Sequence, residues 1–241
     1  MLELIDVHYE VSEDGVSREI LKGINLKIED NFVVITGPNG SGKSTLAKVI
    51  AGIYTPTSGK ILFDGQDITD WTVTDRARAG ISFGFQQPVR FKGLTVRDLL
   101  DLAHGSPLGL DEACKYLSEV GLCAKDYIDR ELNNSLSGGE AKRIEIAMIM
   151  ARGTKLSLFD EPEAGIDLWS FNNLIRVFEK MRETINGSIM IISHQERILN
   201  IADKVVVLAD GKIGAIGKKD EILPTLLKAN SACDALTSKL V

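Results

Sequence analysis

The hydrophobic pattern at the start of the chain predicts two β-strands. Leu2, Leu4 and Val7 lie near alternate positions, as expected of a strand with one buried face. A polar stretch from Ser12 to Ser17 is interpreted as a loop. A second strand is predicted near Ile20 to Ile28.

Three further runs are apolar without alternation, which indicates strands that are buried on both faces in a parallel sheet. They comprise Phe32 to Thr36, Leu156 to Phe159, and Ile189 to Ile192. Near the end of the chain, Val205 to Leu208 and Ile213 to Ile216 flank an Asp-Gly turn and are predicted to form a hairpin.

Helical spacing marks two regions. Apolar residues between Leu46 and Ile53 recur at i, i+3, i+4 and i+7, which places them on one helical face. The stretch from about Val96 to Tyr127 also has helical spacing. We predict a helical subdomain over approximately residues 88–150, inserted into the α/β core of a single domain that covers residues 1–241.

The composition indicates an ordinary soluble globular protein. Of the 241 residues, 44% are hydrophobic and 26% are charged, and no apolar run reaches the roughly 18 residues that span a bilayer. The acidic residues Glu3, Asp6 and Glu10 argue against a signal peptide at the start. The net charge of -6 gives no basic surplus for neutralising phosphates, so we expect no nucleic-acid partner.

The cysteines show no ligand pattern. Cys114, Cys123 and Cys233 are scattered and odd in number, so the sequence predicts neither a disulfide framework nor a zinc site. Unpaired thiols fit a reducing compartment, and we expect a cytoplasmic location.

A glycine-rich segment follows the apolar run that ends at Thr36. It matches G-x-x-x-x-G-K-[ST], a phosphate-binding loop whose glycines let successive backbone N–H groups face phosphate oxygens. Lys43 is expected to bridge the β- and γ-phosphates and Ser44 to ligate Mg²⁺, while the next helix directs its positive N-terminus at the anion. The segment therefore predicts a Mg-ATP site. Its residues are Gly37, Pro38, Asn39, Gly40, Ser41, Gly42, Lys43, Ser44 and Thr45.

Two carboxylates follow the second apolar run. Asp160 and Glu161 come directly after Leu156 to Phe159, at the strand end where open α/β sheets bind ligands. Alone, this pair is more typical of a helix N-cap with an acidic first turn. Because a phosphate loop lies upstream, we interpret Asp160 as part of the Mg²⁺ shell and Glu161 as the group that orients or deprotonates the attacking water.

The segment Leu136 to Glu140, L-S-G-G-E, opens a predicted helix. Ser137 and Glu140 have the spacing of a capping box, and the simplest interpretation is a well-capped helix. Two glycines in a first turn cost up to about 1 kcal/mol each relative to alanine, which close approach of the backbone to a ligand would explain. Because helix N-termini bind anions, we interpret Ser137, Gly138 and Gly139 as a second phosphate-binding element.

The phosphate loop, the L-S-G-G-E segment and the D-E-P sequence at 160–162, in this order, resemble the ATP-binding cassette (ABC) ATPases over nearly the whole chain. The resemblance implies an α/β fold of the P-loop NTPase type, with a mainly parallel core sheet, an N-terminal antiparallel β subdomain and an inserted helical subdomain. It also implies hydrolysis of Mg-ATP by an ATP-dependent homodimer, or by a pair with a similar cassette. Each nucleotide would lie between the phosphate loop of one subunit and the L-S-G-G-E segment of the other, which is called the signature segment below.

The resemblance assigns roles to three more residues. Gln86 resembles the glutamine that contacts Mg²⁺ and the attacking water. Asp167 ends a loop that resembles the one crossing the dimer interface. His194 resembles the switch histidine that contacts the γ-phosphate, although a lone histidine is more often structural.

One position departs from the family pattern. Many cassettes place an aromatic residue that stacks on adenine ahead of the phosphate loop, and Val11 occupies that position here. Two alternatives remain. Either Tyr9, two residues earlier on the same strand face, takes over the stacking, or adenine is held more loosely.

Three segments resemble, more narrowly, the SufC-type ATPases of iron–sulfur cluster assembly. They are F-Q-Q-P-V at 85–89, S-G-G-E-A-K-R-I-E at 137–145 and H-Q-E-R-I-L at 194–199. The D-E-P form at 160–162 is instead similar to that of transport cassettes. The resemblance implies a soluble scaffold partner of the SufB/SufD type, and the alternative is a membrane permease.

Overall fold

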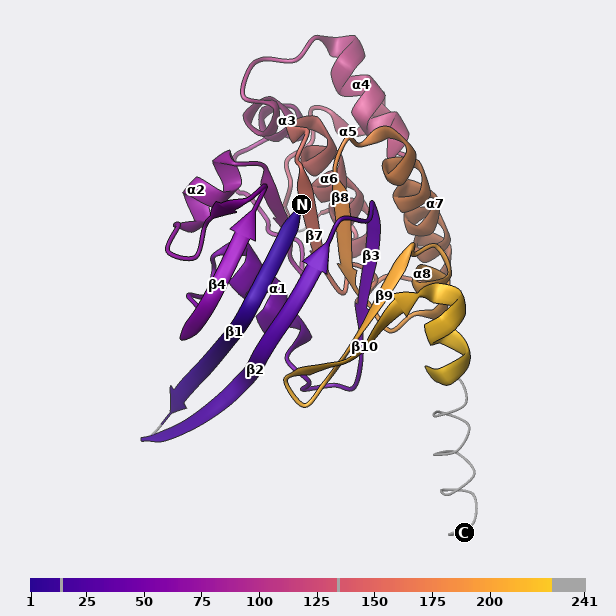
Figure 1. The fold of residues 1–241 in the computed structure, drawn as a ribbon. Coiled ribbons are helices and arrows are strands. Elements are labelled where there is room, and N and C mark those ends of the chain that lie inside the picture. The colour runs from indigo at the N-terminus through magenta and orange to yellow at the C-terminus, as the bar shows by residue number, and fades with distance from the viewer. Residues whose placement is uncertain (14, 134, 227–241) are drawn as a thin grey trace.

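Two β-sheets form the framework of the structure, a computed structural model that describes residues 1–13, 15–133 and 135–226. One sheet is antiparallel and has the order β2-β1-β4-β5. The other has the order β10-β9-β3-β8-β7-β6, with parallel pairing from β9 to β6 and an antiparallel edge strand, β10 (Figure 1). The strands are β1 Leu2–Glu13, β2 Val16–Ile28, β3 Phe32–Thr36, β4 Ser58–Phe63, β5 Gln66–Asp67, β6 Ile81–Gly84, β7 Leu156–Asp160, β8 Ser188–Ile192, β9 Lys204–Ala209 and β10 Lys212–Lys218.

Helices cover both faces of the larger sheet. Helix α1 contacts strands of both sheets, whereas α6 and α7 pack on the opposite face of the larger sheet (Figure 1). The helices are α1 Lys43–Ala51, α2 Val73–Arg78, α3 Val96–His104, α4 Leu110–Glu119, α5 Ala124–Tyr127, α6 Gly138–Arg152, α7 Leu168–Thr184 and α8 Glu196–Asn200. Residues 219–226 are also helical, and residues 227–241 lie outside the described part of the chain.

The central strand β3 shows why its sequence does not alternate. Phe32 and Val34 belong to the core cluster that contains α6 and α7, whereas Val33 and Ile35 belong to the cluster that contains α1 and the antiparallel sheet. All four side chains are completely buried. Successive side chains point to opposite faces, so a strand between two cores must be apolar at every position. The predicted mixed α/β architecture is thus confirmed.

Helices α3, α4 and α5 pack at one end of the molecule, with α3 and α4 against α6 (Figure 1). The helix α6 is buried on most of its circumference, because it separates these helices from the larger sheet. The helices α3 to α6 follow one another over the part of the chain for which the sequence predicts an inserted helical subdomain. The assignment of residues 88–150 to that subdomain, within a single domain, stays a prediction.

Two local predictions were wrong. The stretch from Ser12 to Ser17 contains the ends of β1 and β2, because these strands continue to pair up to the contact of Glu13 with Val16. Ser12, Val16 and Ser17 are exposed, so no hydrophobic alternation marks the strands there. Helix α1 ends at Ala51, and Ile53 follows it as an exposed residue.

The C-terminal end of α1 is held by an arginine from α2. The Arg76 side chain is only 1% exposed and donates hydrogen bonds to the carbonyl oxygens of Val49 at 2.7 Å and Ile50 at 2.9 Å. It also binds the carbonyl oxygens of Thr69 and Trp71. The last carbonyls of a helix lack intrahelical partners, and a cation placed there also favours the helix dipole. Burial lowers the pKa of this guanidinium.

Within the described chain, no helix combines the length and hydropathy that crossing a bilayer requires.

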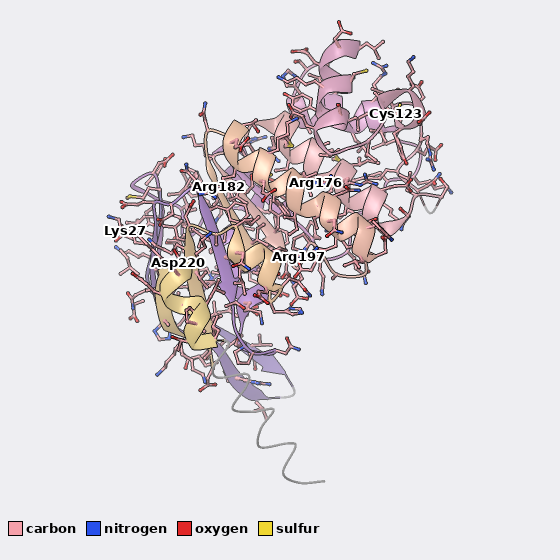
Figure 2. The ribbon with its side chains drawn as sticks, turned by 90° about the vertical axis from the view of Figure 1, so that its right-hand side faces the viewer. Lys27, Cys123, Arg176, Arg182, Arg197 and Asp220 are labelled. Atoms are coloured by element: carbon pink, nitrogen blue, oxygen red, sulfur yellow. The ribbon has the colours of Figure 1, made fainter. Side chains whose placement is uncertain are left out.

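Cys114 and Cys123 are free thiols. Figure 2 shows Cys123 in the helical region, far from Asp220 in the helix of residues 219–226. Cys233 lies outside the described residues.

Candidate active site

The phosphate loop connects the end of β3 to the start of α1. Its first residue, Gly37, has a φ of 142°, and a Cβ atom there would lie 1.9 Å from the carbonyl oxygen of Leu208. Both the conformation and the close approach of β9 therefore require glycine. At the other end, Gly42 precedes α1 in a left-handed conformation.

The N-terminus of α1 has no side-chain cap, because its N-cap residue is Gly42. The N-cap residues of α6 and α7, Ser137 and Asp167, do accept hydrogen bonds from backbone N–H groups of their helices. The first N–H groups of a helix lack intrahelical acceptors. At α1 they are therefore available to an anion.

The loop brings an ammonium group and two hydroxyl groups together. The Lys43 ammonium is buried and donates to the carbonyl oxygens of Gly37 and Pro38, each at 2.9 Å. The Ser44 hydroxyl donates to the Asp160 carboxylate at 2.8 Å. The Ser41 hydroxyl is buried and has no hydrogen-bond partner among the described residues. Buried polar groups usually have a partner, so an unpaired hydroxyl in this loop suits a site that binds a polar ligand.

A cavity of about 320 Å³ opens over the loop. It is lined by residues of the loop and of α1, by Glu161 and by Arg18 and Ile20 from β2. Sequence reasoning missed Arg18 and Ile20, because the β1–β2 hairpin carries no phosphate-binding motif. The exposed guanidinium of Arg18 adds a positive charge at the mouth of a cavity that suits a polyanion.

The two predicted carboxylates have different environments. Asp160 ends β7 and is buried, and this burial raises the pKa of its carboxyl group; the hydrogen bond from Ser44 opposes the rise. Glu161 is only partly buried, lines the cavity and accepts a hydrogen bond from the Gln86 side-chain amide at 2.9 Å. The Glu161 backbone has a φ of 42°, an uncommon conformation for a residue other than glycine, and its N–H donates to the Ile192 carbonyl at 3.0 Å. The structure thus brings Gln86 and Glu161 together beside the loop.

A third carboxylate lies behind this pair. Glu163 is buried and accepts a hydrogen bond from the Ser193 hydroxyl, whereas its other carboxylate oxygen has no partner among the described residues. Ser193 also accepts a hydrogen bond from the Gln195 N–H at 3.0 Å. Burial raises the pKa of Glu163. The pair therefore connects the loop after β7 to the turn that contains the exposed His194.

The L-S-G-G-E segment forms the predicted capping box, with reciprocal hydrogen bonds between Ser137 and Glu140. A Cβ atom at Gly139 would lie 2.9 Å from the Ser170 hydroxyl, which itself donates to Asp167 at 2.7 Å. An internal contact with α7 therefore accounts for Gly139. At Gly138 a Cβ atom would meet nothing closer than 3.6 Å.

The signature residues and Asp167 do not line the cavity over the phosphate loop. Within one chain, the two predicted phosphate-binding elements thus form separate surfaces. Asp167 is exposed, and its side chain caps α7 by accepting hydrogen bonds from the N–H groups of Trp169 and Ser170. The hydrogen bond from the Ser170 hydroxyl, followed by these backbone hydrogen bonds, lowers the pKa of Asp167.

The structure does not bring Tyr9 to the cavity. Its ring stacks on Tyr54, with centroids 5.2 Å apart and an angle of 7° between the planes. Both rings pack against the core beside α1. The hairpin residues that line the cavity are instead Arg18 and Ile20. Stacking of adenine on Tyr9 therefore stays a prediction, and Tyr9 is not among the residues that line the cavity.

The donor set near the loop fits Mg²⁺. Among the described residues, no cluster of three or more His, Cys, Asp or Glu side chains could hold a metal. Mg²⁺ is usually bound by one or two carboxylates together with substrate phosphates and water. The Ser44 hydroxyl and the Asp160 carboxylate, in contact with each other, supply hard oxygen ligands of this kind.

The fold and the phosphate loop define a P-loop nucleotide-binding protein. A family model described as "ABC transporter" matches residues 21–164, more than half of the chain, and the chain therefore belongs to this family. The matched range contains the phosphate loop, the L-S-G-G-E segment and the two carboxylates at the end of β7, Asp160 and Glu161.

Several known proteins are similar over most of their length. "Uncharacterized ABC transporter ATP-binding protein MJ0035" of Methanocaldococcus jannaschii is 40% identical over 215 residues, covering 86% of each chain. "Probable ATP-dependent transporter ycf16" of Pyropia yezoensis is 35% identical over 233 residues, covering 90% of this chain and 91% of the relative. A solved structure named "Dimeric structure of a post-hydrolysis state of the ATP-binding cassette MJ0796 bound to ADP and Pi" has a TM-score of 0.80 and 25% identity, covering 91% of this chain and 99% of the other. The predicted ABC ATPase fold is confirmed.

Proposed function

We propose that this chain binds Mg-ATP and hydrolyses it as the ATPase subunit of an iron–sulfur cluster assembly complex. One observation carries the ATPase proposal. Ser44 and Glu161 line a single cavity over a phosphate loop, where Ser44 contacts Asp160 at 2.8 Å and Glu161 contacts Gln86 at 2.9 Å. Phosphoryl transfer depends mainly on positioning and charge neutralisation, and these groups supply both.

In the proposed site, backbone N–H groups of residues 39–45 and the Lys43 ammonium bind the β- and γ-phosphates. Ser44, Asp160 and Gln86 would hold Mg²⁺, which would neutralise phosphate charge. A divalent cation would also favour the ionised form of Asp160, which burial alone disfavours.

Glu161 accepts a proton from the attacking water, or orients it, while the oxygen of that water forms the new bond to the γ-phosphorus. The bond from this phosphorus to the oxygen it shares with the β-phosphate breaks, and the products are ADP and phosphate. Gln86 fixes the Glu161 carboxylate through its amide hydrogen bond. His194 is proposed to contact the γ-phosphate.

The signature segment and Asp167 act on a nucleotide held by a second subunit. Two features support this role: they do not line the chain's own cavity, and a similar cassette is named as a dimer bound to ADP and Pi. We therefore propose a homodimer, or a pair with a similar cassette, that closes around ATP. Light scattering with and without Mg-ATP tests this, and a monomer under both conditions would refute it.

A protein partner is proposed to dock in an apolar groove of about 340 Å³ beside Gln86. Phe85, Val89 and Leu102 line this groove and are exposed hydrophobic residues. Exposed apolar patches of this kind mark interaction sites. The residues at 85–89, 137–145 and 194–199 resemble SufC-type ATPases, which favours a soluble SufB/SufD-like scaffold.

The second candidate is the nucleotide-binding subunit of a membrane transporter. Two features favour it: relatives are named as probable ATP-dependent transporters, and the D-E-P sequence at the end of β7 resembles that of transport cassettes. Affinity purification of the tagged chain from its native lysate separates the candidates. Co-purification of a soluble scaffold supports cluster assembly, and co-purification of a membrane-spanning subunit supports transport. Phosphate release with Mg-ATP tests the ATPase activity that both share.

A further inference from the structure

A buried ion pair on α6 holds the residue that precedes Gln86. Lys142 is 1% exposed, and its ammonium lies 2.8 Å from a carboxylate oxygen of Glu145 one helical turn later. The ammonium also donates to the carbonyl oxygen of Phe85. The other carboxylate oxygen of Glu145 accepts the Phe85 N–H at 3.2 Å. Both backbone polar groups of Phe85 are thus bound by side chains of a single helix.

The next residue along the chain is Gln86, whose amide donates to Glu161 at 2.9 Å. Strand β6 ends at Gly84, so Phe85 and Gln86 lie beyond the sheet and are not held by strand pairing. The hydrogen bonds from Lys142 and Glu145 therefore hold the Phe85 backbone at a point where strand pairing has ended.

Stability alone does not account for a charged pair at this place. Burial raises the pKa of the Glu145 carboxyl group, and the ammonium of Lys142 opposes that effect. A buried ion pair is often no more stabilising than a well-packed apolar pair of similar volume. An apolar pair, however, could not bind the N–H and the carbonyl oxygen of Phe85.

We propose that Lys142 and Glu145 are positioning residues, which fix Gln86 beside Glu161 by gripping the Phe85 backbone. The proposal rests on the proposed ATPase function for its kinetic consequence. The geometric part stands without it. Glu145 and Phe85 also line the apolar groove, so a partner bound there would contact the Lys142–Glu145 pair or the backbone that it holds.

The test compares the wild type with the double variant Lys142→Met/Glu145→Leu, which keeps an apolar pair of similar volume, and with Glu145→Gln, which can still accept the Phe85 N–H. We expect kcat to fall roughly tenfold in the double variant and less in Glu145→Gln, because small misplacements of catalytic groups lower the rate strongly. KM for ATP should stay within about twofold, because the loop that binds phosphate is unchanged. Lys155→Met, which removes an exposed lysine paired with Asp64, is the control and should keep wild-type kcat.

Hydrogen exchange of the Phe85 and Gln86 amides without nucleotide supplies a second readout. We expect faster exchange in the double variant than in the wild type, at an unchanged melting temperature. Wild-type kcat in the folded double variant, or unchanged exchange at these two amides, would overturn the proposal. An inactive wild type would refute the proposed ATPase function. The exchange result would then still decide whether Lys142 and Glu145 hold the backbone at Phe85 and Gln86.

Discussion

Replacing Ser193 by alanine is expected to destabilise the chain more at alkaline than at acidic pH. The Ser193 hydroxyl is fully buried and is the donor to one oxygen of Glu163, whose other oxygen has no partner among the described residues. Ser193→Ala would leave a buried carboxylate with neither oxygen bonded to a side chain. The N–H of Gln195 would also lose its acceptor.

The size of the effect follows from these contacts. Leaving a buried polar group unsatisfied costs about 1–3 kcal/mol and more where the group is charged, and the lost contact of the partly buried Gln195 N–H adds less than about 1 kcal/mol. We therefore expect Ser193→Ala to lower the free energy of unfolding by roughly 2–4 kcal/mol where Glu163 is ionised.

The sign of the pH dependence follows from the pKa of Glu163. Burial raises this pKa above 4.5, and the Ser193 hydrogen bond partly opposes the rise. A carboxyl group with a raised pKa contributes most stability at low pH, and this contribution is lost as the pH rises through the folded-state pKa. Ser193→Ala raises the pKa further, so the loss extends to higher pH. At low pH the protonated carboxyl group needs no donor, and the variant should approach the wild type.

Ser157→Ala is the matched control. Ser157 lies on the neighbouring strand β7, is also fully buried, and pairs at 2.8 Å with the hydroxyl of Thr154, which does not titrate. Its replacement should cost about 1 kcal/mol independently of pH. The assay is urea unfolding of all three proteins at about pH 5 and about pH 8. An equal cost of Ser193→Ala at both pH values, or a cost no larger than that of Ser157→Ala at the higher pH, would refute the reasoning.

Three further predictions concern nucleotide binding and turnover. Glu161→Gln should bind ATP normally but lower turnover at least about a hundredfold and trap an ATP-bound dimer, as measured by phosphate release and light scattering; undiminished hydrolysis would remove Glu161 from its role. Lys43→Ala should weaken ATP binding about tenfold or more in calorimetry, because an ammonium on the phosphates is lost, and an unchanged Kd would contradict this. Arg18→Ala should weaken ATP binding roughly threefold at low salt and less at high salt, whereas Arg18→Lys keeps the charge and the affinity; a loss that salt does not reduce would exclude the electrostatic role.

Much of the fold could be predicted from the sequence, because two strong local signals mark it. Strands between two cores are apolar at every position. Helix α6 begins with a capping box in which Ser137 and Glu140 make both of the expected hydrogen bonds. The hairpin of β1 and β2 was less visible, since its strands pair through backbone hydrogen bonds up to Glu13 and Val16 while the side chains of Ser12, Val16 and Ser17 are exposed. Such a stretch looks like a loop in the sequence.

The candidate site could be predicted only where a residue belongs to a motif. The contacts Ser44–Asp160 and Gln86–Glu161 join such residues, although no local pattern could show that they meet. Arg18 and Glu163 were missed because each gains its place from a strand or turn far away in the sequence. Gly139 was interpreted through a ligand, whereas the structure shows a contact with Ser170 that only the packing of α6 against α7 creates.

The guanidinium of Arg76 has a consequence for the opposite end of α1. It binds the carbonyl oxygens of Val49 and Ile50 near the C-terminal end of a nine-residue helix, and these hydrogen bonds oppose fraying of that end before a ligand arrives. The backbone that receives the triphosphate is therefore preorganised, and binding of nucleotide loses little conformational entropy in ordering it. Loosening this remote anchor would weaken nucleotide binding without altering any atom that touches the nucleotide.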